Sequence, residues 1–255
     1  MSSARALPRL SPAWLQLASA LILIALWQLG AELAESRFLP VPLAVVEVLG
    51  AELASGDLLR HVGITLLRVA ASFTLAMSIG MAIGIAMGCY RTLDRFLDGW
   101  LVLFLNIPAL VTIILCYVWF GLIEAAAVAA VAINKIPNVV VTLREGARAL
   151  DRDYREMAAV FRFGRIKTLR HVILPQLFPF IIAAARSGLA LIWKIVLVVE
   201  LLGRSDGVGF QLHLFFQLFD VASILAYTIA FVLVVQAIEL FILQPLETRA
   251  NRWRR

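Results

Sequence analysis

The sequence has little charge for its length. Only 16% of its 255 residues are charged, whereas 62% are hydrophobic, and the mean hydropathy is +0.92. Soluble domains are about 25% charged and roughly 45–50% apolar. One soluble core cannot bury this much apolar surface, so lipid must be the solvent for much of the chain. The basic residues alternate with long apolar runs and form no stripe on a polar domain, which argues against a nucleic-acid-binding protein.

Residues that could carry chemistry are also few. Cys89 and Cys116 lie inside apolar segments without CxxC or His-paired spacing, and we expect both to be buried core residues. The three histidines are too scattered for a metal site, and no Ser-His-Asp set, HExxH or paired Asp motif lies within an apolar run. A membrane enzyme therefore has little support.

Six apolar runs are present, at residues 10–31, 69–90, 99–123, 125–143, 177–202 and 221–243. A span needs about 20 residues, and backbone groups in lipid must be satisfied within their own segment, so these runs predict helices. The fourth run is interrupted by Lys135 and Pro137. The first is longer than a signal-peptide core of about 7–15 residues, which favours an uncleaved helix. We therefore predict an all-α polytopic membrane protein with six spans.

Basic residues are concentrated on one side of the predicted spans. With the N-terminus in the cytoplasm, sixteen of the 23 Lys and Arg residues fall in cytoplasmic segments, which fits the positive-inside rule. The opposite side holds Glu32, Glu35, Glu47, Glu52 and Asp57 and few basic residues. Both termini are therefore predicted to be cytoplasmic.

Small residues recur every four positions in the second run. Gly80, Gly84 and Gly88 continue a series that begins at Ser72 and Ala76. Stacked on one helix face, such residues let a neighbouring helix backbone approach closely. The series predicts a tight helix bundle.

The chain divides into three regions. Residues 1–60 combine the first span with an external segment in which residues 43–53 predict an amphipathic helix lying on a surface. Residues 61–248 hold the other spans and a charged loop at about 151–175, and residues 249–255 form a basic tail. Within the loop, Met157, Val160, Phe161 and Phe163 would form an apolar ridge among arginines. Such a ridge suggests a docking surface for a soluble partner.

The loop resembles the EAA loop of ABC importer permeases, whose pattern is E-A-A, three residues, G, nine residues, I, any residue, L-P. The corresponding positions are Glu156, Met157 in place of the first Ala, Ala158, Val172, Leu174 and Pro175. Arg162 stands where the family usually has Gly, and Gly164 follows two residues later. Residues 65–68, 106–109, 199–203 and 207–209 also resemble the nitrate/sulfonate/taurine branch of these permeases.

The resemblance implies a type I importer fold and a set of partners. Two permease subunits, by default two copies of this chain, would enclose the pathway in a bacterial plasma (inner) membrane. Each coupling helix would bind a subunit of a cytoplasmic ATPase dimer, and an extracytoplasmic binding protein would deliver the substrate. The chain has no G-x-x-x-x-G-K-[ST] phosphate loop, so ATP and Mg would be bound by the ATPase and no cofactor by this chain. The implied coupling residues are Glu156, Met157, Ala158, Ala159, Val160, Phe161, Arg162, Gly164, Leu174 and Pro175.

Charged residues within spans are costly, about 2.5–3.5 kcal/mol each on insertion scales, and are candidates for function. Lys135 and Lys194 would attract an anion in the pathway, although Lys194 could instead pair with an acid such as Glu239 on a neighbouring helix. Glu200 matches a Glu position of the resembled branch and is a candidate gate or packing residue. Pro108, in the resembling stretch 106–109, completes the candidate pathway.

Two other classes of transporter remain as alternatives. A secondary transporter driven by an ion gradient would show inverted repeats with matching broken helices, which we do not find. An exporter is disfavoured because the EAA loop belongs to importers. The sequence predicts a small anionic substrate and leaves sulfonates, nitrate-like anions, aromatic acids and thiamine-precursor-like molecules open.

Overall fold

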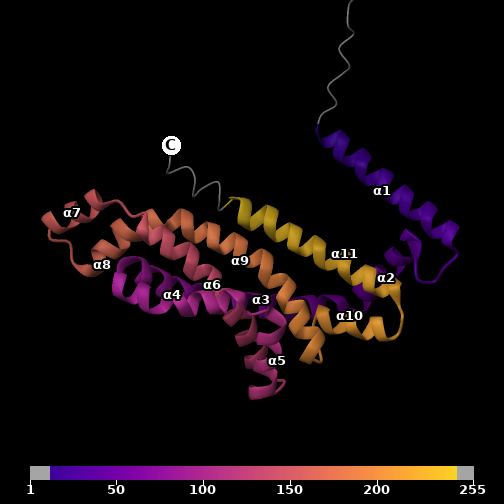
Figure 1. Cartoon of the computed structure of the whole chain (residues 1–255). Helices are drawn as coiled ribbons and strands as arrows, with labels where there is room; N and C mark the ends of the chain where they lie inside the picture. The colour runs from indigo at the N-terminus through magenta and orange to yellow at the C-terminus, as the bar shows by residue number, and fades with distance from the viewer. Residues whose placement is uncertain (1–11, 246–255) are drawn as a thin grey trace, which may run out of the picture.

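The computed structural model describes residues 12–245, and every regular element in that range is a helix (Figure 1). The predicted basic tail at 249–255 lies outside these residues, as do Arg5 and Arg9. Two elements, η1 and η2, are short π-helical turns. The elements are α1 (Pro12–Ala34), α2 (Pro42–Ser55), α3 (Asp57–Cys89), α4 (Arg91–Asn106), α5 (Ala109–Phe120), α6 (Glu124–Arg148), α7 (Arg152–Val160), α8 (Arg165–Thr168), η1 (Leu169–Ile173), α9 (Leu174–Gly203), α10 (Val208–Gln217), α11 (Val221–Ile238) and η2 (Glu239–Leu243).

Helices α3, α6 and α9 form the centre of the bundle, and α3 packs against α6 along most of its length. The small residues of α3 face α6. A Cβ placed at Gly80 would lie 2.6 Å from the Cβ of Val139, and one at Gly88 would lie 2.4 Å from the Cβ of Ala147. Only glycine permits this approach, so the four-residue series sets the distance between the two helices.

Five helices in the described range are long and apolar enough to cross a membrane, or six if the bent pair α4 and α5 counts as one span. The prediction of one straight helix over 99–123 was wrong. Helices α4 and α5 meet at an angle of 96°. Ile107 has extended backbone, as expected for a residue before proline, and Pro108 immediately precedes α5. The proline therefore ends one helix and orients the next.

The second span begins earlier than expected. The prediction set its start after Arg68 because a charge normally marks the membrane boundary. Arg68 is instead only 4% exposed and is paired with carboxylates, so α3 begins at Asp57 and passes through it. The domain boundary predicted at residue 60 falls inside this helix.

Two prolines, Pro137 and Pro175, lie within continuous helical segments. Helix α6 is continuous through Pro137. Pro175 lies in the first turn of α9, and the π-helical turn η1 connects α9 directly to α8. A proline lacks one backbone N–H, and a π-helical turn shifts the hydrogen-bond register so that the helix can continue.

Helices α1, α2 and α11 lie to one side of the centre. Residues 43–53 are indeed helical, but α2 packs on α11 through the buried Val45, and the Tyr227 hydroxyl donates a 2.7 Å hydrogen bond to Glu52. Helix α1 stands apart in Figure 1, and its side chains are exposed almost all round. Such an apolar helix needs lipid or another protein around it.

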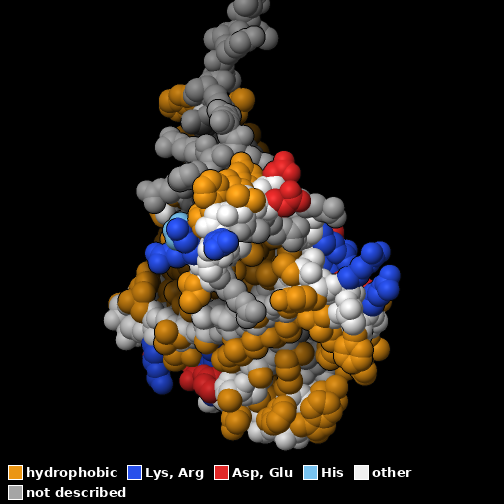
Figure 2. All heavy atoms as spheres, turned by 90° about the vertical axis from the view of Figure 1, so that its left-hand side faces the viewer, with side chains coloured by type: hydrophobic (Ala, Val, Ile, Leu, Met, Phe, Trp, Pro, Cys, Tyr) orange, Lys and Arg blue, Asp and Glu red, His pale blue; other side chains and the backbone are white. Residues whose placement is uncertain are grey.

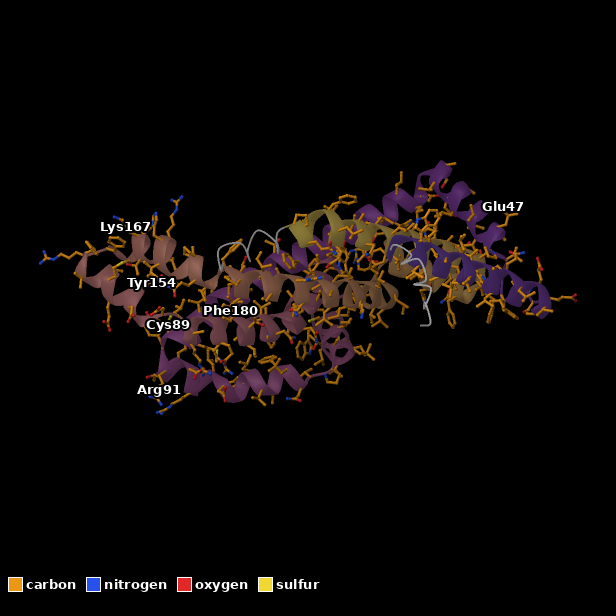
Figure 3. All side chains as sticks on the ribbon, turned by 90° about the horizontal axis from the view of Figure 1, so that it is seen from above. Glu47, Cys89, Arg91, Tyr154, Lys167 and Phe180 are labelled. Carbon is orange, nitrogen blue, oxygen red and sulfur yellow. The ribbon has the colours of Figure 1, made fainter. Side chains whose placement is uncertain are left out.

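The two ends of the bundle differ in charge. Figure 3 places Cys89 and Arg91 toward the same end as Tyr154 and Lys167, with Glu47 toward the other end. Viewed from the side of α7 and α8, Lys and Arg side chains lie around an apolar body (Figure 2). We call this the basic end and the opposite one the outer end. Cys89 is exposed here, contrary to prediction, because α3 ends at this residue; Cys116 is buried as expected.

Candidate functional site

The loop between α6 and α9 forms a short hairpin of helices α7 and α8. Helix α7 ends in a turn in which the Phe163 N–H donates a 2.8 Å hydrogen bond to the Ala158 carbonyl. Arg162 has a φ of +50°, a left-handed conformation that glycine adopts more easily. The bend thus lies at Arg162, where the resembled family usually has Gly, and not at Gly164.

The apolar ridge of the loop faces away from the bundle. Val160 is 77% exposed and Phe161 is 68% exposed, and Met157 is also exposed. Phe163 is half-buried because the Lys167 ammonium lies 4.2 Å from its ring centroid. Large apolar side chains at the tip of a charged loop gain by binding a partner.

The other predicted loop residues are spread along the hairpin. Glu156 and Gly164 are exposed, whereas Ala158 is buried. Ala159 lies in α7, and its side chain is outside the described set. Leu174 and Pro175 occupy the exposed first turn of α9. A surface cavity of about 640 Å³ lies beside α8, lined by Gly164, Ile166, Lys167, Arg170 and His171.

Lys135 is enclosed by the helices of its own chain. Its side chain is 2% exposed, and a Cβ at Gly188 on α9 would lie 3.1 Å from its Cε. No residue in the described range makes an ion pair with it. The absence of a side chain at Gly188 therefore gives the lysine stem its space.

Lys194 lies in the second half of α9, toward the end that leads to α10, and its side chain is exposed in the single chain. Glu239, which was the expected alternative partner of Lys194, instead forms an ion pair with Arg186 at 2.8 Å. Lys194 has no acidic partner within the described range, and its flanking neighbour Trp193 is buried. A lysine exposed within a membrane-spanning helix needs water, a second protein or an anion beside it.

A cluster of ion-paired side chains, which we call the clamp, lies at the outer end. It joins α3, α6 and the segment after α9. The Arg68 Nη1 group donates a 2.8 Å hydrogen bond to Glu200, whose side chain is 0% exposed. Its Nη2 group lies 2.6 Å from Glu124 and also bonds Asp206. Although burial opposes it, the Arg68 charge lowers the pKa of Asp206 below its ordinary value, so this carboxylate stays ionised at neutral pH.

The first turn of α10 is held by the same cluster. The N–H groups of Gly207, Val208 and Gly209 donate to His61 Nδ1, Thr65 Oγ1 and Glu200 Oε2, at 2.9, 2.9 and 2.8 Å. These are N–H groups that a helix leaves without internal partners. Glu200 was predicted to be a gate or packing residue. It is a buried carboxylate whose two oxygens already accept hydrogen bonds.

The sequence contains a signal for this clamp, but the prediction did not bring its parts together. His61, Thr65 and Arg68 recur at i, i+4 and i+7 on one face of α3. The stretches 65–68, 199–203 and 207–209 had each been noted separately, but their contact depends on the packing of α3 against α9. Glu124 and Asp206 were missed altogether.

The described residues contain no group of three or more His, Cys, Asp or Glu side chains able to hold a metal ion. The charges of the clamp are paired with one another, whereas the apolar ridge, Lys194 and Pro108 are exposed.

Comparison with known proteins identifies relatives over most of the chain. The profile of the family described as "Binding-protein-dependent transport system inner membrane component" matches residues 76–244. SsuC of Escherichia coli (strain K12), named for aliphatic sulfonates transport, is 35% identical over 190 residues, which is 74% of this chain and 72% of SsuC. SsuC of Bacillus subtilis (strain 168) is 29% identical over 235 residues, covering 91% and 85%.

A more distant relative and a solved structure are also similar to this chain. The nitrate import permease protein NrtB of a Synechocystis strain is 25% identical over 198 residues, covering 74% of this chain and 72% of NrtB. A chain from the MetNI methionine ABC transporter in inward-facing conformations superposes with a TM-score of 0.64 at 15% identity, covering 79% of this chain and 96% of that chain. This likeness shows the fold.

Proposed function

Because the chain belongs to the family of binding-protein-dependent transport system inner membrane components, we propose that it carries a small anionic solute across the membrane. As a member of this family it is a permease of an ABC importer with the type I importer permease fold, and the prediction of this family and fold is confirmed. It is a transport protein located in the inner membrane.

The observation that carries the anionic assignment is Lys194. It is exposed within the membrane-spanning helix α9, and its expected partner Glu239 is engaged by Arg186. An ammonium group within a membrane span attracts anions more strongly than one in bulk water, because the surrounding dielectric is lower. Two of the relatives are named for the transport of sulfonates and of nitrate, which are anions. Their names support an anionic solute for this chain as well.

The other candidate pathway residues take different parts in this proposal. Lys135 is buried among α3, α6 and α9, so in this proposal it lies behind the residues that line the pathway. Pro108 allows α5 to leave the line of α4 at the edge of the bundle. Glu200 holds α10 at the outer mouth together with Arg68.

ABC importer permeases work with ATPase and substrate-binding partners, and the loop suggests how this one does so. We assign the exposed ridge Met157, Val160 and Phe161 to contact with a cytoplasmic ATPase dimer. ATP and Mg bind that partner, and no cofactor binds this chain. The extracytoplasmic binding protein docks at the outer end.

A second copy of the chain completes the pathway in this proposal, with lipid around the pair. The exposed side chains of α1 and the outward-facing Lys194 both call for such cover. The basic end lies in the cytoplasm of a bacterial plasma (inner) membrane, with both termini on that side. The basic residues of α7, α8 and the start of α4 support this orientation.

Uptake by proteoliposomes tests the anionic assignment. The intact complex, purified with its companions, is reconstituted and supplied with ATP and with labelled alkanesulfonate, nitrate or bicarbonate. We expect ATP-dependent uptake of one of these anions, at least tenfold slower in Lys194→Met and close to wild type in Lys194→Arg, which keeps the charge. Lys135→Met should reduce uptake less. Unchanged uptake of the native anion in both Met variants would refute the assignment.

A further inference from the structure

A cavity of about 530 Å³ opens at the basic end, between the end of α3, the start of α4 and the end of α6. It does not belong to the loop or to the proposed pathway. Three arginines and one aspartate line it, along with the last residues of α3. The full lining is Met87, Gly88, Cys89, Arg91, Asp94, Arg95 and Arg148.

The cavity has an excess of unpaired positive charge. Asp94, its one acid, is engaged by Arg148 and Arg144 of α6. Arg91 and Arg95 are exposed and make no ion pair with any residue in the described range. They also lie in the first turns of the 16-residue helix α4, whose N-terminal N–H groups add partial positive charge. The cavity is therefore complementary in charge to a phosphate group.

An exposed apolar stripe begins directly beside this cavity. Phe96 is 72% exposed, and Trp100 and Leu103 are exposed on the same side of α4. These residues are spaced at i, i+4 and i+7, so they share one helix face. Val102, Phe104 and Leu105 are exposed on other faces of α4, but they do not continue the line from the cavity. The stripe leads away from the basic end toward the middle of a membrane-spanning pair of helices. A charged cavity that continues into an apolar stripe matches a molecule with an anionic head and a hydrocarbon tail.

We propose that this cavity binds the phosphodiester headgroup of an anionic phospholipid from the cytoplasmic leaflet. Arg91 and Arg95 bind the phosphate oxygens, and Arg148 stays with Asp94 at the back of the cavity. The acyl chains lie along Phe96, Trp100 and Leu103. Basic pockets between membrane helices on the cytoplasmic side recognise lipid headgroups in this way.

Quenching of tryptophan fluorescence tests the proposal, because Trp100 lies on the proposed acyl-chain path. The intact complex is reconstituted in vesicles of phosphatidylcholine containing increasing fractions of brominated phosphatidylglycerol or brominated phosphatidylcholine. The Trp100 signal is the difference between wild type and Trp100→Phe. We expect half-maximal quenching of Trp100 at a lower fraction of phosphatidylglycerol than of phosphatidylcholine.

Removal of the two free arginines should abolish this preference. Arg91→Gln combined with Arg95→Gln should weaken apparent phosphatidylglycerol binding by about fivefold for each arginine lost. The matched control, Arg37→Gln with Arg60→Gln, removes the same charge from exposed positions at the outer end and should keep the preference. Equal quenching by both lipids, or an unchanged preference in the Arg91/Arg95 variant, would overturn the proposal. So would a Trp100 that neither lipid quenches, since a protein then covers this face.

Cys89 supplies a second readout, since it lines the cavity whereas Cys116 is buried. Phosphatidylglycerol should slow alkylation of Cys89 by a water-soluble maleimide severalfold relative to phosphatidylcholine. Excess inorganic phosphate should not reproduce that protection, because it lacks the acyl chains. Equal protection by inorganic phosphate alone would show a soluble-anion site and contradict the assignment to lipid.

Discussion

At the scale of single residues, the loop depends on neighbours along the chain, whereas the clamp depends on contacts between segments far apart in the sequence. The loop residues are predictable from their order along the chain, since the bend, the ridge and the last proline follow one pattern. The clamp joins Arg68, Glu124, Glu200 and Asp206 across more than a hundred residues. The position of Arg68 beside an apolar run suggested a membrane boundary. Only the packing of α3 against α9 shows that Arg68 is a buried ion-pair partner.

The left-handed backbone at Arg162 predicts that glycine is favourable there. Because an L-residue pays about 1 kcal/mol for this conformation, Arg162→Gly should slow amide hydrogen exchange at Phe163 by about fivefold. Gly164→Ala is the matched control, since Gly164 has an ordinary φ and open space around it, and exchange should be unchanged. Faster exchange in Arg162→Gly would contradict the assigned bend.

The clamp predicts a strong effect of removing its shared cation. Arg68→Met leaves the buried Glu200 without its ion pair, so it should destabilise the protein by about 3 kcal/mol or more. A thermal unfolding scan in detergent measures this loss as a lower midpoint. Arg60→Met, an exposed position two turns earlier in α3, should leave the midpoint unchanged. Equal midpoints for the two variants would show that the clamp contributes no stability.

At the scale of elements, helix contact explains which predictions succeeded. The glycine series in α3 predicted close packing, and the structure shows α6 as the helix it meets. The bend between α4 and α5 had a visible cause in Pro108, but the apolar run around it hid the change of direction. The continuation of α6 through Pro137 was not predictable, because packing on α3 and α9 holds the helix together on both sides of the proline.

The α3–α6 contact predicts that added methyl groups separate the helices. A Cβ at Gly84 would lie 2.8 Å from the Val140 carbonyl oxygen, and one at Gly88 would lie 2.7 Å from the Arg144 carbonyl oxygen. Gly84→Ala and Gly88→Ala should each destabilise by about 1–3 kcal/mol, measured by the same unfolding scan. Gly63→Ala in the same helix meets nothing within 4 Å and should be neutral or slightly stabilising. Destabilisation by Gly63→Ala alone would contradict this account.

At the scale of the whole molecule, charge distribution determines how the bundle sits in the membrane. The sequence predicted six spans, and the described residues hold five, or six if the bent pair α4 and α5 counts as one. Their sidedness stays a prediction, made because basic loops and apolar runs alternate along the chain. The sequence could not show what covers α1 or Lys194, because those contacts belong to partners outside one chain.

Sidedness predicts which cysteine is reached from which face. Cys89 is exposed at the basic end, so a membrane-impermeant maleimide should label it only after spheroplasts are permeabilised. Cys116 should stay unlabelled in both conditions because it is buried. Arg37→Cys, at the exposed outer end, should be labelled in intact spheroplasts. Labelling of Cys89 before permeabilisation would reverse the proposed orientation.

The most direct test of coupling is the set of proteins that leaves the membrane with this chain. The tagged chain is purified from its native membranes in mild detergent beside the double variant Val160→Asp/Phe161→Asp and the double variant Phe38→Asp/Leu39→Asp, which replaces two adjacent exposed apolar residues at the outer end. We predict that an ATPase accompanies the wild type and the Phe38/Leu39 variant but is lost from the Val160/Phe161 variant. An ATPase retained by the Val160/Phe161 variant, or absent from the wild type while other membrane complexes stay intact, would contradict the account.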